Sequence, residues 1–368
     1  WVNTKPGGAF RDMKRKPGTN TLYAVTESEC WTSYNEGITW NQVSSGLNIP
    51  SGTDGLRLGV SAADNNIVYI LANGNNGVLF KSTDSGLNFS QTYSSNTQCI
   101  VCYDEDPPSG TQGNYNLGMC ADPFDANHVY VVAHCLWESN DGGISFQQKT
   151  EWYANLHTDH HQVEVDPYDI NQLWNINDGG VWRRQGTNDS LWDPKSDGVG
   201  ATEIYHAGQA TRNKKLLSIG TQDNGELFYD GTWKTNRGGD WGSRVYFDYS
   251  AGNTIYYLSE GERRTFTPYG GSSNYNSPFT PTNDSRIAFH QNLPDIALLS
   301  ENAVWMTRNL TDGTPSWTNI FSTTNDTRDL CISTADSTIA FVISDNNRFT
   351  RIQNLLTTPV ITNLRSEE

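Results

Sequence analysis

The 368-residue chain contains few methionines, few cysteines and few basic residues, and it has no long apolar run. No stretch reaches the roughly 18 apolar residues that a membrane-spanning helix needs, so no such helix is expected. The 25 Lys and Arg residues face 41 Asp and Glu residues, which gives a net charge of −16. Because so acidic a chain would be repelled by a phosphate backbone, nucleic acid is not an expected partner.

Six cysteines are too sparse for a disulfide-stapled scaffold in a chain of this length. Cys99 and Cys102 form a single Cys-x-x-Cys pair, and no second pair stands at the spacing of a zinc finger. A local disulfide or free thiols are therefore expected there rather than a structural zinc ion.

Glycine and aromatic residues are abundant, with 33 Gly, 12 Trp, 17 Tyr and 13 Phe. Together with many Asn, Ser and Thr residues, they disfavour long helices and favour short strands joined by turns. Short apolar runs recur along the whole chain, around Tyr23, Tyr69, Tyr130, Trp174, Leu217, Tyr256, Ala297 and Ile339. Most of the intervals between them are 39 to 46 residues long, and one is 61.

A repeat of this length is typical of a four-stranded β-propeller blade. We therefore predict an all-β chain in which residues 1–368 form a single β-propeller domain of eight blades, with seven as the alternative. The longest interval holds an insertion at residues 99–113, which is either a functional loop on a rigid scaffold or a tolerated surface excursion. The chain is expected to be a segment of a longer secreted or surface protein.

A shorter motif, Ser-x-Asp-x-Gly-x-x-Trp/Phe, also repeats. It occurs at residues 82–89 and 139–146, and residues 33–40 match it with Asn in place of Asp. The motif resembles the Asp-box of the BNR-repeat β-propeller superfamily, which includes sialidases, xyloglucanases and sortilin receptors. We expect its residues to be structural, with the Asp capping a tight turn and the Gly adopting a backbone geometry that a Cβ would prevent. They are Asp84, Gly86, Asp141 and Gly143.

A third set of motifs lies at residues 157–167, 177–182, 221–225 and 238–240. In this order and spacing they resemble the motifs of secreted bacterial propellers that are named as BNR-repeat glycosyl hydrolases or sortilin-like proteins. The resemblance implies an extracellular or cell-surface location. It implies little about activity, because the arginine triad of sialidases and the catalytic aspartates of xyloglucanases have no match in this sequence.

Blade topology predicts that these motifs meet at one mouth of the central channel, opposite the Asp-boxes. The side chains expected to contact a ligand there are His157, His160, His161, Asn177, Asn224 and Trp241. The candidate catalytic carboxylates are Asp159, Asp178, Asp223 and Asp240. A divalent cation could be held by Asp159, His161, Asp223 and Asp240, with calcium favoured over zinc because most of these donors are oxygen atoms. A hydrogen-bonded polar plug is the alternative.

Three functions compete for this face. The one we favour is a non-enzymatic module that binds or displays a polysaccharide or other glycan, a peptide, a neighbouring protein chain or another domain of the same chain. The second is a glycoside hydrolase that uses two carboxylates as acid and base. The third is a polysaccharide lyase, in which a histidine would abstract a proton beside a uronate.

Overall fold

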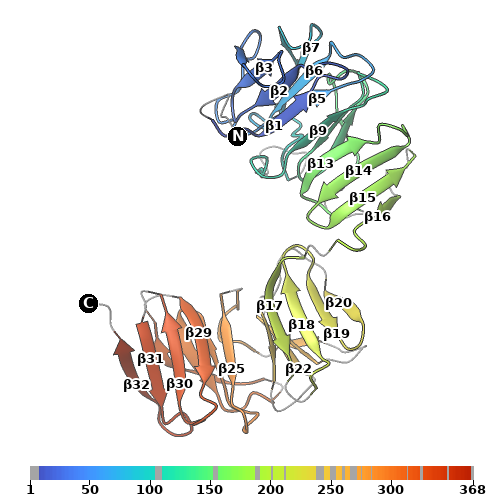
Figure 1. Cartoon of the computed structure of the whole chain (residues 1–368). Helices are drawn as coiled ribbons and strands as arrows, with labels where there is room; N and C mark the ends of the chain where they lie inside the picture. The colour runs from blue at the N-terminus through green and yellow to red at the C-terminus, as the bar shows by residue number, and fades with distance from the viewer. Residues whose placement is uncertain are drawn as a thin grey trace. The chain divides into compact units, whose positions relative to one another are not determined.

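The computed structural model (Figure 1) contains 32 β-strands and no helix in the part of the chain that it describes. The described residues are 8–103, 110–151, 156–186, 191–199, 202–210, 213–237, 244–248, 254–258, 262–265, 272–274, 276–282, 284–312, 314–323, 326–345 and 348–365. Within them, no helix is long and apolar enough to cross a membrane. The chain divides into two compact units, residues 1–200 and residues 201–368.

Unit 1 contains four sheets. Sheet 1 consists of β1 (Asp12–Arg15), β2 (Leu22–Val25), β3 (Cys30–Ser33) and β4 (Asn41–Val43). Sheet 2 consists of β5 (Leu56–Val60), β6 (Val68–Ala72), β7 (Val78–Ser82) and β8 (Ser90–Tyr93). Sheet 3 consists of β9 (Gly118–Ala121), β10 (Val129–Val132), β11 (Leu136–Ser139) and β12 (Gln147–Gln148). Sheet 4 consists of β13 (His160–Val165), β14 (Gln172–Asn177), β15 (Gly180–Gln185) and β16 (Trp192–Pro194).

Unit 2 also contains four sheets. Sheet 5 consists of β17 (Ile204–Gln209), β18 (Leu217–Thr221), β19 (Glu226–Tyr229) and β20 (Trp233–Arg237). Sheet 6 consists of β21 (Val245–Phe247), β22 (Thr254–Tyr257), β23 (Glu262–Thr265) and β24 (Ser272–Asn274). Sheet 7 consists of β25 (Arg286–Phe289), β26 (Ala297–Ser300), β27 (Ala303–Thr307) and β28 (Trp317–Ser322). Sheet 8 consists of β29 (Thr327–Ile332), β30 (Ala340–Ser344), β31 (Arg348–Gln353) and β32 (Val360–Arg365).

In every sheet the four strands pair antiparallel in chain order, as in a propeller blade. The predicted fold class is therefore confirmed: the chain is all-β, with eight four-stranded blades rather than seven, consistent with an eight-bladed β-propeller. Each of the eight recurring apolar runs lies on or beside the second strand of a sheet.

The core lies between successive sheets. Strand β6 is buried along its whole length, and Ile70 from this strand packs with Phe80 of the same sheet and with Val25 of sheet 1. A four-stranded sheet of such short strands has too small an apolar face to be stable alone, so it depends on its neighbours. In unit 1 the innermost strands β1, β5, β9 and β13 accordingly contact one another in chain order.

The turn between the third and fourth strands is built alike in sheets 2 and 3. Asp141 Oδ1 accepts the backbone N–H groups of Ile144 at 2.9 Å and Ser145 at 3.0 Å. Asp84 Oδ1 accepts the equivalent groups of Leu87 and Asn88 at 3.1 and 2.9 Å. Each carboxylate thus satisfies two backbone donors that the tight turn leaves without a strand partner.

The glycines of these turns have backbone angles that disfavour a side chain. Gly86 has φ +79°, and a Cβ there would lie 2.9 Å from the ring of Tyr23 in sheet 1. Gly143 also has φ +79°, and its Cβ would lie 2.1 Å from Leu79 in sheet 2. The turn of one sheet therefore packs directly against the preceding sheet, and only glycine leaves the room for it.

We predict that Asp141→Ala lowers the free energy of unfolding by about 1–2 kcal/mol, because two backbone donors lose a charged acceptor. The melting temperature should fall by several degrees in a calorimetric scan. Asp141→Asn is the matched control, since Asn35 caps the turn of sheet 1 in the same way, accepting the N–H of Thr39 at 2.9 Å. Equal melting temperatures for Asp141→Ala and the wild type would contradict the capping role.

A half-buried imidazole lies between two carboxylates near the same end of sheet 3. His128 Nδ1 lies 3.0 Å from Asp122 Oδ2, and its Nε2 lies 2.6 Å from Glu138 Oε1. The second oxygen of Glu138 pairs with Lys149 Nζ at 2.9 Å. Burial alone would lower the pKa of His128, but hydrogen bonds to Asp122 and Glu138 outweigh it and raise the pKa to about 9.

This ion-pair arrangement predicts a loss of stability in mild alkali. The pKa of His128 is 6.5 in the unfolded chain and about 9 in the folded chain. Its contribution to the free energy of unfolding is therefore complete below pH 6.5 and is lost as the pH rises to 9. Urea unfolding at pH 6 and pH 9 should show a decrease of roughly 1–3 kcal/mol from this group. His128→Gln should remove that part of the pH dependence, and an unchanged slope in the variant would refute the assignment.

Candidate functional site

The end of the sheets opposite the turns between the third and fourth strands carries a recurring side-chain contact. A residue at the entrance to the innermost strand contacts a residue at the exit of the second strand, an arrangement that we name the strand-exit clasp. It is seen in six of the sheets, as Arg11–Glu27, Asp54–Asn73, His161–Asp178, Tyr205–Gln222, Ser285–Glu301 and Arg328–Asp345. The two kinds of loop therefore lie at the same end of each sheet, as the topology predicted.

In three sheets the entrance residue of the clasp lies in a β-bulge. The registers of β13, β17 and β29 shift at His161, Tyr205 and Arg328. In these sheets the clasped residues are 17 positions apart, whereas Arg11 and Glu27 are 16 apart in sheet 1, which has no bulge. A bulge adds one residue and redirects its side chain, so it turns the entrance residue toward its partner.

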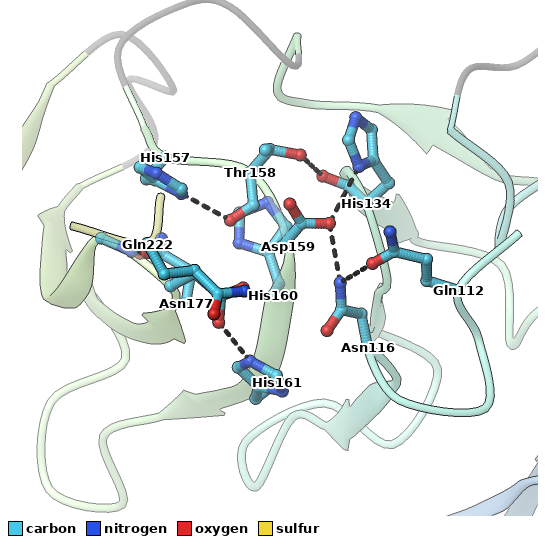
Figure 2. A network of polar contacts seen from close by, with 12 residues as sticks. Gln112, Asn116, His134, His157, Thr158, Asp159, His160, His161, Asn177 and Gln222 are labelled. Atoms are coloured by element: carbon cyan, nitrogen blue, oxygen red, sulfur yellow. Dashed lines mark hydrogen bonds and ion pairs between the residues drawn. The ribbon is translucent and has the colours of Figure 1, made fainter. Parts of the chain in front are cut away.

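Sheets 3 and 4 together have the most elaborate group of polar side chains, shown in Figure 2. Asp159 stands at the entrance to β13 with a left-handed backbone, φ 58°. Its Oδ1 accepts Asn116 Nδ2 at 2.7 Å and His134 Nδ1 at 3.0 Å. We name Asn116, His134, Asp159, His161 and Asp178 the strand-exit cluster.

The carboxylate of Asp159 is held in its ionised form. Burial would raise its pKa, but the hydrogen bond from His134, the nearby imidazoles of His134 and His157, and the amide of Asn116 bring the net pKa below the usual value. Thr158 fixes the same loop from the other side by donating its hydroxyl to the backbone oxygen of His134 at 2.6 Å. The loop before β13 is thereby tied to the exit of sheet 3.

His160 is almost completely buried, with 1% of its surface exposed. Its Nδ1 donates to Asn175 Oδ1 at 2.9 Å, and Asn177 Nδ2 donates to the same oxygen at 3.0 Å. Burial lowers the pKa of His160 to about 4, so the imidazole is neutral at physiological pH. His160 and Asn177 therefore offer little surface to a ligand. Their contacts are of the kind expected for a hydrogen-bonded polar plug, which is the alternative to a cation site.

His161 is more accessible than His160 and lies beside an exposed ring. Its Nε2 pairs with Asp178 Oδ1 at 2.5 Å, and its imidazole meets the ring of Tyr115 edge to face, with centroids 5.1 Å apart.

His157 lies at the start of the loop before β13, where its Nδ1 donates to the backbone oxygen of Thr158 at 2.9 Å. A Cβ on Gly179 would lie 2.5 Å from the His157 side chain, so the glycine permits this close packing.

The insertion supplies site residues that no motif indicated. Cys99 and Cys102 form a disulfide at its start, as one of the two alternatives for this pair predicted. Tyr103 meets the ring of His134 edge to face, and Gln112 Oε1 accepts Asn116 Nδ2 at 3.0 Å. The extra length of this interval was the one sequence signal that pointed to them.

The remaining predicted site residues lie in unit 2. Asp223 has φ 59°, in the turn between β18 and β19. Asn224 Nδ2 donates to the backbone oxygen of Gln222 at 3.2 Å in the same turn. Asp240 and Trp241 lie outside the described residues, so their roles stay predictions.

The predicted cation site draws on both units and includes Asp240, so it too stays a prediction. Across the described ranges, no three His, Cys, Asp or Glu side chains converge closely enough to hold a metal ion. In unit 1, Asp159 Oδ1 already accepts two hydrogen bonds, and His161 Nε2 is paired with Asp178. These contacts occupy atoms that a cation would need.

No protein-family model matches the chain, and no curated protein matches it. Among solved structures, the Niastella koreensis GH74 enzyme is 13% identical, with 94% of this chain and 68% of that chain covered and a TM-score of 0.38. The GH74 xyloglucanase from Xanthomonas campestris is 11% identical over 95% of this chain and 60% of that chain, with a TM-score of 0.40. YCF48 from Cyanidioschyzon merolae is 13% identical over 93% and 94%, with a TM-score of 0.37. Because the identities and TM-scores are all low, these likenesses identify neither a family nor an activity.

The contacts of Asp159 predict a structural effect of its removal. Asp159→Ala should lower the free energy of unfolding by about 1–3 kcal/mol, because Asn116 and His134 each lose a hydrogen bond to the carboxylate and alanine would occupy a left-handed φ. Asp159→Asn should lose less, since asparagine tolerates this backbone and keeps an acceptor oxygen. Chemical denaturation of both variants measures the difference.

Two outcomes would contradict this structural role of Asp159. One is a wild-type unfolding free energy for Asp159→Ala. The other is a calcium-dependent rise in the melting temperature of the wild type that Asp159→Asn abolishes, because this result would place a cation at the carboxylate.

Proposed function

We propose that this chain is a non-enzymatic binding module and that its ligand, a glycan, a peptide or a neighbouring protein chain, docks on the strand-exit end of the sheets. The observation that carries the proposal is Tyr115, whose ring is 68% exposed beside the His161–Asp178 clasp. An exposed aromatic ring next to fixed polar groups is the usual composition of a recognition surface.

The electrostatics of Asp159 do not suit the acid role in glycoside hydrolysis. A glycosidase needs one carboxyl group with a raised pKa, so that it is protonated and can act as the acid. The contacts of Asp159 instead lower its pKa, and they hold its carboxylate through Asn116 and His134. This arrangement suits a fixed negative group that positions its neighbours.

We further propose that residues 1–368 form one eight-bladed ring of the BNR/Asp-box type and that the chain works outside the cell or on its surface. The shared strand order of the eight sheets and the recurring Asp-box turns support the first part. The Cys99–Cys102 disulfide supports the second, because disulfides persist mainly in oxidising compartments.

Tyr115→Ala should weaken binding by about tenfold or more, as removal of a central aromatic contact usually does. The full chain would be tested against immobilised neutral and acidic polysaccharides and against a peptide library, with affinities measured by biolayer interferometry. Tyr168→Ala is the matched control: this ring is 95% exposed, but it lies in the turn between β13 and β14, at the opposite end of sheet 4.

The proposal predicts that Tyr168→Ala binds like the wild type and that no bound polysaccharide is cleaved. Release of reducing ends from a bound polysaccharide would establish a hydrolase instead. Equal losses in the two tyrosine variants would show that the strand-exit end is not the binding surface.

A further inference from the structure

Unit 2 contains a cavity that the strand-exit cluster does not include. It has a volume of about 620 Å³ and lies among the innermost strands β17, β21, β25 and β29. Its size is within the range of small-ligand sites, which is roughly 300–1,000 Å³. Its residues belong to sheets 5 to 8 and were not singled out by any motif.

The cavity lining carries no formal charge. None of its residues is Asp, Glu, Lys or Arg, although 18% of the whole chain is charged. The imidazole at its wall is that of His206, whose pKa is lowered by burial and by the nearby guanidinium groups of Arg244 and Arg286. Its Nδ1 accepts the backbone N–H of Val245 at 3.1 Å, so the neutral ring carries its proton on Nε2. A charged ligand would find no counter-charge on this lining, which favours a neutral one.

Hydrogen-bonding groups are nevertheless plentiful around the cavity. Each of the four strands pairs with a partner along one edge only, so part of the backbone N–H and C=O groups on its other edge has no strand partner in the described structure. Amide side chains extend this set, since Gln209, Gln291 and Asn292 also line the cavity. The lining therefore offers mixed donors and acceptors without charge.

Aromatic and small residues complete the walls. Tyr246 lines the cavity as a partly exposed ring and packs on His206 with ring centroids 5.0 Å apart, whereas Phe247 and Phe289 lie in the wall behind it as buried core residues. Space is left by Gly208 and Ala288, which also line it. A Cβ on Gly208 would lie 2.9 Å from the backbone oxygen of Val245, so a larger residue would push the two strands apart.

We propose that this cavity binds a neutral saccharide. A sugar ring has apolar faces that pack on an aromatic ring and hydroxyl groups that both donate and accept; the partly exposed ring of Tyr246 and the uncharged polar lining provide a partner for each. An extended peptide that adds to a sheet edge is the alternative occupant, because β17 and β29 have six residues each, and the labelling experiment distinguishes it from a saccharide. The site lies beyond the proposed function, because it shares no residue with the Tyr115 surface.

Cys331 provides a reporter for occupancy. It lines the cavity and is an exposed free thiol, whereas Cys30, Cys120 and Cys135 are buried and the other two cysteines form the disulfide. Labelling of the native full chain with dithiobis-nitrobenzoate should show one accessible thiol that Cys331→Ser removes. A panel of neutral di- to tetrasaccharides at millimolar concentration should contain a member that slows this labelling at least threefold.

Cys331→Trp supplies a second test, because the indole would fill part of the cavity. Calorimetric affinity for the protecting saccharide should fall at least tenfold in Cys331→Trp and change less than twofold in Cys331→Ser. Tyr168→Ala, which changes an exposed ring outside both proposed sites, should leave this affinity unchanged. If the tryptophan variant does not fold, the labelling experiment on the native chain still decides.

Three results would overturn the saccharide site. The first is a labelling rate that no neutral saccharide changes. The second is protection by short uncharged peptides instead of saccharides, which would assign the cavity to a peptide. The third is a saccharide whose binding is lost in Tyr115→Ala and kept in Cys331→Trp; this would place all binding on the strand-exit end and leave the proposed function intact.

Discussion

The structure depends on the need of each small sheet to bury both of its faces. Strands of two to six residues give a sheet too little apolar area to stand alone, so successive sheets must stack. Stacking in turn requires that the turns at the sheet ends satisfy their own backbone groups within a small volume. The carboxylate caps of Asp84 and Asp141, with glycines packed against the preceding sheet, meet this requirement at one end.

At the opposite end of the sheets, the loops are held together by contacts between side chains. The two ends therefore differ in their chemistry. The clasps pair groups of very different kinds, from Arg328–Asp345 to Tyr205–Gln222, so the contact is preserved while the residues vary. Such a surface can change its recognition chemistry without loss of the fold. The strand-exit cluster of sheets 3 and 4 is the most developed case, because the insertion adds Tyr103 and Gln112 to it and the exposed Tyr115 follows directly after the insertion.

The blade number and the end of each sheet where the motifs lie could be predicted from sequence, because both follow from the repeat period and strand order. The convergence of His161 with Asp178 follows from the same reasoning. The bulges could not be predicted, since His161, Tyr205 and Arg328 share no residue type. Asn116 and Tyr115 carry no motif, and they lie just after the insertion, before β9. The cavity of unit 2 depends on small residues in separate sheets, such as Gly208 and Ala288, whose proximity no local pattern encodes.

The central claim is that the polar side chains at the strand-exit end are engaged with one another in a fixed network. A site-specific NMR titration of the imidazole of His160 in the full chain tests this claim most directly. Its burial against Asn175 predicts a pKa of about 4, with a single neutral tautomer above that pH. Titration near pH 6.5, the ordinary value for a solvated imidazole, would show that His160 is open to solvent and would contradict the account.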